Sequence, residues 1–111
     1  MPNNKTNPFL ISANCFGPNP TIQNPSTSYT VLADDDIIVC GANSLAITLT
    51  ASSNSPVYIT SIDGTTQRTG CTVVVGSQDF AIADDGCGAL CFRYGPASAN
   101  LWAVVGAKTA S

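Results

Sequence analysis

The stretch LAITLT (residues 45–50) decides the fold class. Leu45, Ile47 and Leu49 alternate with smaller residues, and this period of two is typical of a strand with one buried face. Other short apolar runs occur along the chain, and turns rich in Gly, Asn, Asp and Pro separate them. Such spacing predicts an all-β domain of about eight strands. The predicted strands are residues 29–32, 37–40, 45–50, 57–60, 71–75, 80–82, 89–94 and 101–105.

The composition excludes several classes of protein. Only 10% of the 111 residues are charged, against about 25% in an average soluble domain. Histidine is absent, which removes Ser-His-Asp and Cys-His catalysis and the commonest zinc ligand. The net charge is −3 with only four cations, so we expect no nucleic-acid partner and no anionic membrane partner. No run reaches the length of about 20 apolar residues that a membrane span needs. We therefore expect a single domain that is not an enzyme.

The N-terminal residues differ from the rest in their proline content. Five of the seven prolines lie in residues 1–27, which excludes a helix or a central strand there. The segment nevertheless carries the apolar residues Phe9, Leu10, Ile11, Phe16 and Ile22. These side chains either pack on the core of the same chain or belong to an extended arm that contacts another subunit. The predicted organisation is an extended N-terminal arm at 1–27, a β-sandwich domain at 28–107 and a C-terminal tail at 108–111.

Five cysteines raise the question of disulfides or metal binding. The N-terminus is polar and interrupted by prolines rather than a secretory signal, so synthesis in a cytoplasm and free thiols are expected. Cys87 and Cys91 are spaced C-x3-C, but no C-x2-C pair exists, and we predict no zinc site. Cys40 and Cys91 lie in apolar runs and are expected to be small buried hydrophobes. A disulfide-stapled secreted adhesin is the alternative.

Two groups of aspartates are the candidates for chemistry. Asp34, Asp35 and Asp36 precede an apolar run, and Asp84 and Asp85 precede a glycine. Calcium binding is one alternative, although the D-x-[DN]-x-[DN]-G spacing is absent. An acid pair of Asp36 with Asp63 is another. Because Asp commonly bonds its own backbone in turns, the favoured prediction is solvated turns with no catalytic residue, metal or cofactor.

The chain has more apolar strand surface than a small domain can bury. Ile37, Ile38 and Val39 are consecutive, as are residues 73–75, so both faces of these strands are apolar. A domain of this size buries only about 60–65% of its unfolded surface. The second apolar face is therefore expected to meet another subunit, which predicts an obligate oligomer. The aromatic residues Tyr58, Tyr94 and Trp102 lie in predicted strands and are expected in the core.

The block from Tyr29 to Gly106 resembles a β-domain of bacteriophage virion proteins, which include head decoration, head-fibre and tail-fibre proteins. The matching stretches are YTVLADDDIIVC, LAITLTAS, VYITSIDGT and ALCFRYGPASANLWAVVG. In that family, Y-x-V leads through paired acids into an apolar strand, a T-[IL]-T-L strand follows, and a strand with Trp closes the domain. This chain departs from the pattern at Thr50-Ala51, where Pro is usual, and at residues 61–63, which replace a lysine-bearing segment.

The resemblance implies a structural role in a virus particle. It implies a homotrimer, most simply a capsid decoration (cement) protein on the outer capsid surface, assembled in the host cytoplasm and bound to the major capsid protein. The capsid contact would come from the arm residues Phe9, Leu10, Ile11, Phe16 and Ile22. The alternative is a tail-fibre or head-fibre module that binds a host-surface receptor or glycan. The expected fold is a small antiparallel β-sandwich or jelly roll of about eight strands, trimeric, with an extended N-terminal arm.

Overall fold

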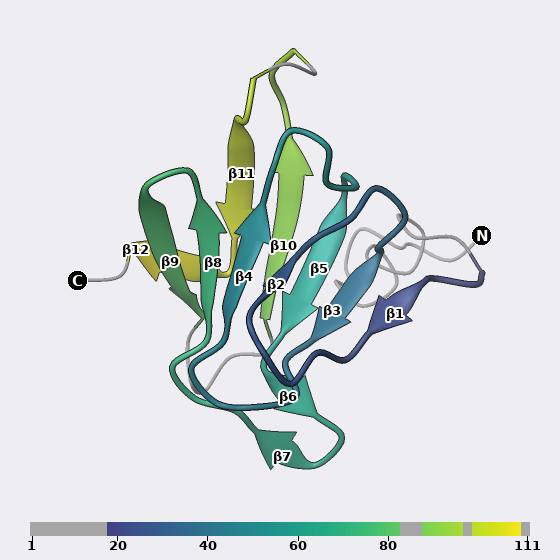
Figure 1. The fold of residues 1–111 in the computed structure, drawn as a ribbon, viewed down its shortest axis with the longest axis vertical. Coiled ribbons are helices and arrows are strands. Elements are labelled where there is room, and N and C mark those ends of the chain that lie inside the picture. Colours follow the sequence, from purple (N-terminus) through teal and green to yellow (C-terminus); the bar gives the residue numbers. More distant parts are fainter. Residues whose placement is uncertain (1–17, 83–87, 97–98, 110–111) are drawn as a thin grey trace, which may run out of the picture.

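The described part of the computed structural model, residues 18–82, 88–96 and 99–109, consists of short strands (Figure 1). It contains no helix, so the predicted all-β class is confirmed, and no helix in these ranges is long and apolar enough to cross a membrane. The twelve strands are β1 (Ile22–Gln23), β2 (Tyr29–Thr30), β3 (Ile37–Val39), β4 (Ala46–Leu49), β5 (Val57–Thr60), β6 (Ile62–Asp63), β7 (Thr66–Gln67), β8 (Thr72–Val75), β9 (Gln78–Ile82), β10 (Gly88–Arg93), β11 (Trp102–Val105) and β12 (Ala107–Thr109).

Ten of these strands form two five-stranded sheets. Sheet A has the order β1-β3-β5-β10-β11, and sheet B has the order β12-β9-β8-β4-β2. The remaining two strands, β6 and β7, pair with each other as a short hairpin. Alternate residues of both sheets are buried in one hydrophobic core, which includes Ile38, Ile59 and Cys91 from sheet A and Ile47 and Val73 from sheet B. This shared core is what holds the two sheets together.

The predicted antiparallel arrangement is wrong for four of the nine strand pairings. The pairs β1–β3, β3–β5, β2–β4 and β4–β8 are parallel. The reason is the path of the chain, because β1 to β5 alternate between sheet A and sheet B. In the pairs β1–β3, β3–β5 and β2–β4 the neighbours are two strands apart in the sequence and run in the same direction. In the pair β4–β8 the strands β5, β6 and β7 lie between the partners in the sequence. The pairings that involve β9 to β12 are antiparallel, namely β8–β9, β9–β12, β5–β10 and β10–β11.

Each of the eight predicted strand ranges overlaps one observed strand, and four further strands were not predicted. The additional strands are β1, β6, β7 and β12, which have two or three residues each. Such short segments carry too few residues for an alternation to be visible. The observed β1 lies inside the range 1–27, and β12 extends into the range 108–111. The sheets therefore begin before Ser28 and continue past Ala107.

Two glycines fix the point where the chain passes from sheet A to sheet B. Gly106 lies between β11 and β12 with φ = 95°, a conformation that residues with a side chain rarely adopt. A Cβ at this position would lie 2.5 Å from the carbonyl oxygen of Gly88. Gly88 begins β10, and a Cβ there would overlap the carbonyl oxygen of Ile59. The close approach of these backbones requires glycine at both positions.

Candidate interaction surface

Four of the five arm residues predicted to contact a capsid lie outside the described residues. These are Phe9, Leu10, Ile11 and Phe16. The fifth, Ile22, lies in β1 at the edge of sheet A, and the residue is 56% exposed. Ile22 therefore belongs to the surface of the described residues rather than to their core.

Asp35 is a buried structural residue, so the prediction of a solvated turn is wrong for this position. Its exposure is 2%. Its carboxylate accepts hydrogen bonds from Tyr29 Oη at 2.6 Å, Leu32 N at 2.9 Å and Gln23 Nε2 at 3.1 Å. Gln23 lies in β1 of sheet A and Tyr29 in β2 of sheet B. The carboxylate thus connects the edges of the two sheets, and its three donors compensate the cost of burying it.

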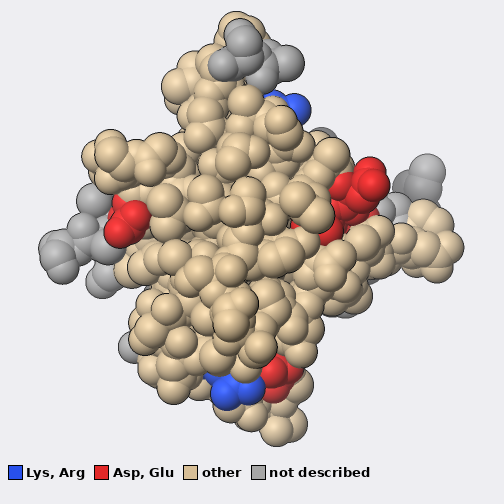
Figure 2. Space-filling view, viewed as in Figure 1, with Lys and Arg blue, Asp and Glu red and all other residues tan. Residues whose placement is uncertain are grey.

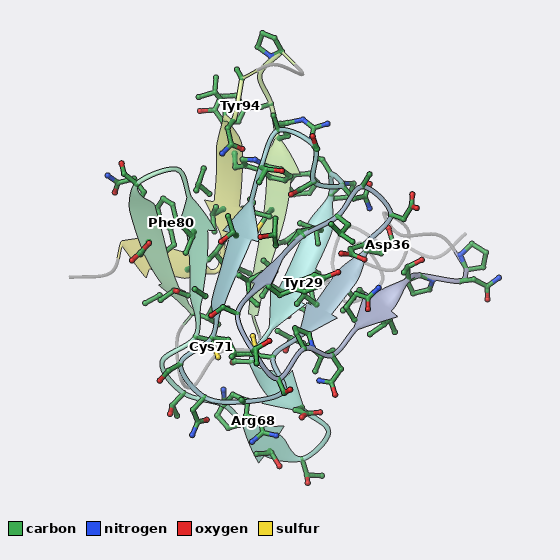
Figure 3. The ribbon with its side chains drawn as sticks, viewed as in Figure 1. Tyr29, Asp36, Arg68, Cys71, Phe80 and Tyr94 are labelled. Atoms are coloured by element: carbon green, nitrogen blue, oxygen red, sulfur yellow. The ribbon has the colours of Figure 1, made fainter. Side chains whose placement is uncertain are left out.

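The neighbouring aspartates have other surroundings. Asp34 is exposed, as predicted for a turn. Asp36 is half-buried and accepts hydrogen bonds from Thr21 N and Asn54 Nδ2, each at 2.8 Å (Figure 3). Asp63 instead forms an ion pair with Arg68 at 3.0 Å on the β6–β7 hairpin. Asp36 and Asp63 therefore have separate partners, and the described residues contain no group of three or more His, Cys, Asp or Glu that could hold a metal ion.

Three groups have raised pKa values because they are buried. Partial burial, followed by the hydrogen bond and charge of Asp35, raises the pKa of Tyr29 to about 12. Burial raises the pKa of Cys91 to about 12, and burial together with the neighbouring Cys71 raises that of Cys40 to about 12. Cys40 and Cys91 have exposures of 0%, which confirms that they are small buried hydrophobes. Thiols with such pKa values are protonated at neutral pH and are poor nucleophiles.

The outer face of sheet A carries a row of apolar and aromatic side chains. Ile22 pairs with Ile37, Ile37 with Tyr58, Tyr58 with Leu90, and Leu90 with Val105. Paired residues lie on the same face of a sheet, and this face is opposite to the one that contains the buried Ile38 and Ile59. The row therefore crosses all five strands. We call Ile22, Ile37, Tyr58, Leu90 and Val105 the apolar row.

The surface around this row is also without charge. Its neighbours on the outer face include Val39, Phe92 and Ala103. The sequence predicted two apolar faces for residues 37–39, and the register places Ile37 and Val39 on the face opposite Ile38. Figure 2 views the molecule from the side of sheet B, where the charged side chains form a few small groups near the periphery. The described surface thus favours contacts with other apolar surfaces over binding to a charged ligand.

A second group of side chains occupies the end of the hairpin β10–β11. Trp102 is buried and donates its Nε1 hydrogen to Asn100 Oδ1 at 2.7 Å. The guanidinium of Arg93 lies 5.6 Å from the Trp102 ring centroid and donates to the Ser53 carbonyl oxygen at 2.6 Å. Tyr94, in contrast, is 68% exposed (Figure 3). The predicted core location is therefore right for Trp102, wrong for Tyr94, and only half right for Tyr58, which is half-buried.

No protein-family model matches this sequence, and neither the curated proteins nor the solved structures give a match.

Proposed function

We propose that this chain is a structural virion protein, a capsid decoration protein that forms a homotrimer and stabilises contacts between major capsid subunits. The observation that carries the proposal is the apolar row, which crosses the five strands of sheet A without a charged residue. Ile22 and Val105 at the two ends of the row are exposed, and Ile37, Tyr58 and Leu90 between them are half-buried. Apolar side chains that remain partly exposed on one sheet face are typical of protein–protein contacts. In this proposal the two sheets form a β-sandwich, and the particle contact is made by the N-terminal arm.

The aspartate network supports a structural role rather than a catalytic one. The carboxylates of Asp35 and Asp36 accept hydrogen bonds from five donors in the surrounding chain. A carboxylate engaged in this way stabilises the fold and has little capacity left for a substrate. The most conspicuous acidic motif of the sequence is thereby explained without an enzymatic activity.

Binding to capsid shells tests the proposal. The full chain is mixed with shells assembled from the major capsid protein of the same virus, and bound protein is measured after sedimentation. We expect saturable binding by the wild type. We expect the loss of binding, with the assembly mass unchanged, when Phe9, Leu10, Ile11 and Phe16 are all replaced by Ser. The matched control is Leu32→Ser, since Leu32 is apolar, 58% exposed and outside the arm.

Two results would contradict the proposal. Wild-type protein that never binds shells would exclude a decoration role. Full binding by the four-serine variant would exclude the arm as the capsid contact, while leaving decoration itself in place.

The exposed Tyr94 favours one other candidate, a tail-fibre or head-fibre module that binds a host-surface glycan. Tyr94 is 68% exposed near the end of the β10–β11 hairpin, and sugars commonly stack on exposed aromatic rings. A glycan array with wild type and Tyr94→Ala tests it. Specific binding that the substitution removes would favour the fibre module, and an array without signal would favour decoration.

A further inference from the structure

The most exposed apolar side chains of sheet A lie along β11 and the adjoining end of β10. The exposures are 44% for Leu101, 59% for Val105 and 68% for Tyr94, and Ala103 between them is also exposed. Tyr94 N donates to the Leu101 carbonyl oxygen at 3.0 Å, so these residues are neighbours across the two strands. We call Tyr94, Leu101, Ala103 and Val105 the β11 strip. It is continuous with the apolar row through Val105.

The backbone edge of β11 is the least protected sheet edge among the described strands. β11 is the last strand in the order of sheet A and has four residues, none of them charged or proline. The opposite edge, β1, has two residues and lies between Pro20 and Pro25. In sheet B, β2 has two residues, and β12 has three with Lys108 at its centre. Proteins usually protect edges with short strands, proline or lysine, and β11 has none of these.

The distribution of charge indicates what kind of partner fits the β11 strip. The chain has a net charge of −3, but the described aspartates lie in the 34–36 turn, β6 and β9, away from β10 and β11. Arg93 is the one charged residue described on this hairpin, and its guanidinium is occupied by Trp102 and the Ser53 carbonyl. A second copy can therefore approach the strip without like-charge repulsion, whereas a charged partner finds no complementary group.

We propose that the β11 strip is the contact between copies of this chain. The inference rests on the self-association in the proposed function and adds the residues at which the copies meet. In a trimer, Tyr94, Leu101, Ala103 and Val105 of each copy would converge on the three-fold axis. This arrangement removes the exposed apolar side chains from water and covers the open edge of β11.

The substitution Val105→Lys tests the contact, with Leu32→Lys as its matched control. The two side chains have nearly equal exposure, 59% and 58%, and only Val105 lies in the strip. The masses of the three proteins are measured by sedimentation equilibrium over a concentration series. We expect the wild type and Leu32→Lys at three times the 11.4 kDa chain mass. We expect Val105→Lys to weaken self-association on the order of 100-fold, since buried unpaired charges in an interface are costly.

One further measurement and one further variant distinguish a lost contact from a misfolded protein. The emission of the single Trp102, which is buried, reports whether each variant is folded. If Val105→Lys does not fold, Val105→Thr replaces it, because Thr is nearly isosteric, favours strands and only exchanges one methyl group for a hydroxyl. We expect this variant to weaken association about tenfold.

The outcomes separate this inference from the decoration proposal. Folded Val105→Lys with the wild-type mass, or a monomeric wild type, would overturn the β11 contact. If that trimeric variant still binds capsid shells, only the location of the contact is wrong. A monomeric Val105→Lys beside a trimeric wild type that never binds shells would support the contact and contradict decoration.

Discussion

The outer faces of the two sheets differ in composition although both sheets have five strands. Across sheet A the paired residues are those of the apolar row. The corresponding row across sheet B is Thr30, Thr48, Val74 and Asp79. Threonine favours strands and leaves a hydroxyl for water, so the sheet B row can face solvent. Of these two rows, the one on sheet A is therefore the more apolar, which is why the proposed self-association is assigned to that face.

The largest effect is expected where both sheets are connected, at Asp35. Asp35→Ala removes the acceptor for Gln23, Tyr29 and Leu32, which loosens one edge of each sheet. We expect a loss of about 3 kcal/mol in the free energy of unfolding, because buried donors lose their partner. Urea unfolding followed by Trp102 emission measures it.

Asp34 provides the matched control for this experiment. It is the exposed neighbour of Asp35, so Asp34→Ala should change the free energy of unfolding by less than about 0.5 kcal/mol. Asp35→Asn keeps one acceptor oxygen and should cost about half as much as Asp35→Ala. Equal losses for Asp34→Ala and Asp35→Ala would show that the carboxylate network does not hold the edges.

The next largest effect is expected from a charge placed in the apolar row rather than in the sheet B row. Leu90→Lys places a charge in the apolar row, and Thr48→Lys places the same charge in the sheet B row. We expect Leu90→Lys to weaken self-association on the order of 100-fold, which corresponds to about 2.7 kcal/mol. Thr48→Lys should change it less than about threefold, since that face remains in solvent. Sedimentation equilibrium gives both constants, and equal weakening would contradict the assignment of assembly to sheet A.

A smaller effect, with a pH dependence, is expected at Tyr29. Its pKa is raised from 10.0 to about 12, so the folded protein holds the phenol proton more tightly than the unfolded chain. The stability contribution is fully present below pH 10 and is lost as the pH rises through 12. Tyr29→Phe should cost about 1 kcal/mol at pH 7 and should make the decline above pH 10 shallower.

The buried thiols also contribute to the pH dependence of the free energy of unfolding. Cys40 and Cys91 have pKa values raised from 9.0 to about 12, so their contribution declines from about pH 9 in wild type and Tyr29→Phe alike. Tyr94→Phe is the control, because Tyr94 is largely exposed and makes no side-chain contact with Asp35. An unchanged slope above pH 10 in Tyr29→Phe would contradict the role of the Tyr29–Asp35 hydrogen bond. Unfolding by urea at pH 7, 9, 10 and 11 provides the comparison.

The smallest effect concerns the sheet B row when it is made apolar. Thr48→Val replaces a hydroxyl by a methyl group at an unchanged shape and should alter the free energy of unfolding by less than about 0.5 kcal/mol. Combined with Thr30→Val, it should begin to create a second association surface. Sedimentation at high protein concentration would then detect species larger than those of the wild type. If none form, apolar composition alone does not explain why sheet A is the assembly face.

The sequence by itself determined the approximate positions of eight of the twelve strands and the two-sided apolar character of residues 37–39. Both follow from local alternation, which needs no knowledge of the partners of a strand. It also identified Cys40, Cys91 and Trp102 as buried. It did not determine strand direction, because alternation is the same in parallel and antiparallel pairs. The alternation of β1 to β5 between the two sheets, with its three parallel pairings and the further parallel pair β4–β8, became visible only in the tertiary structure.

The role of Asp35 was likewise decided by tertiary structure alone. The three consecutive aspartates are identical in chemistry, and only the folded chain brings Gln23 and Tyr29 to one of them. The same holds for the apolar row, whose members are separated by up to 83 positions between Ile22 and Val105 and meet because the sheet register aligns them. Burial and register depend on contacts between residues distant in sequence, and no local pattern encodes those contacts.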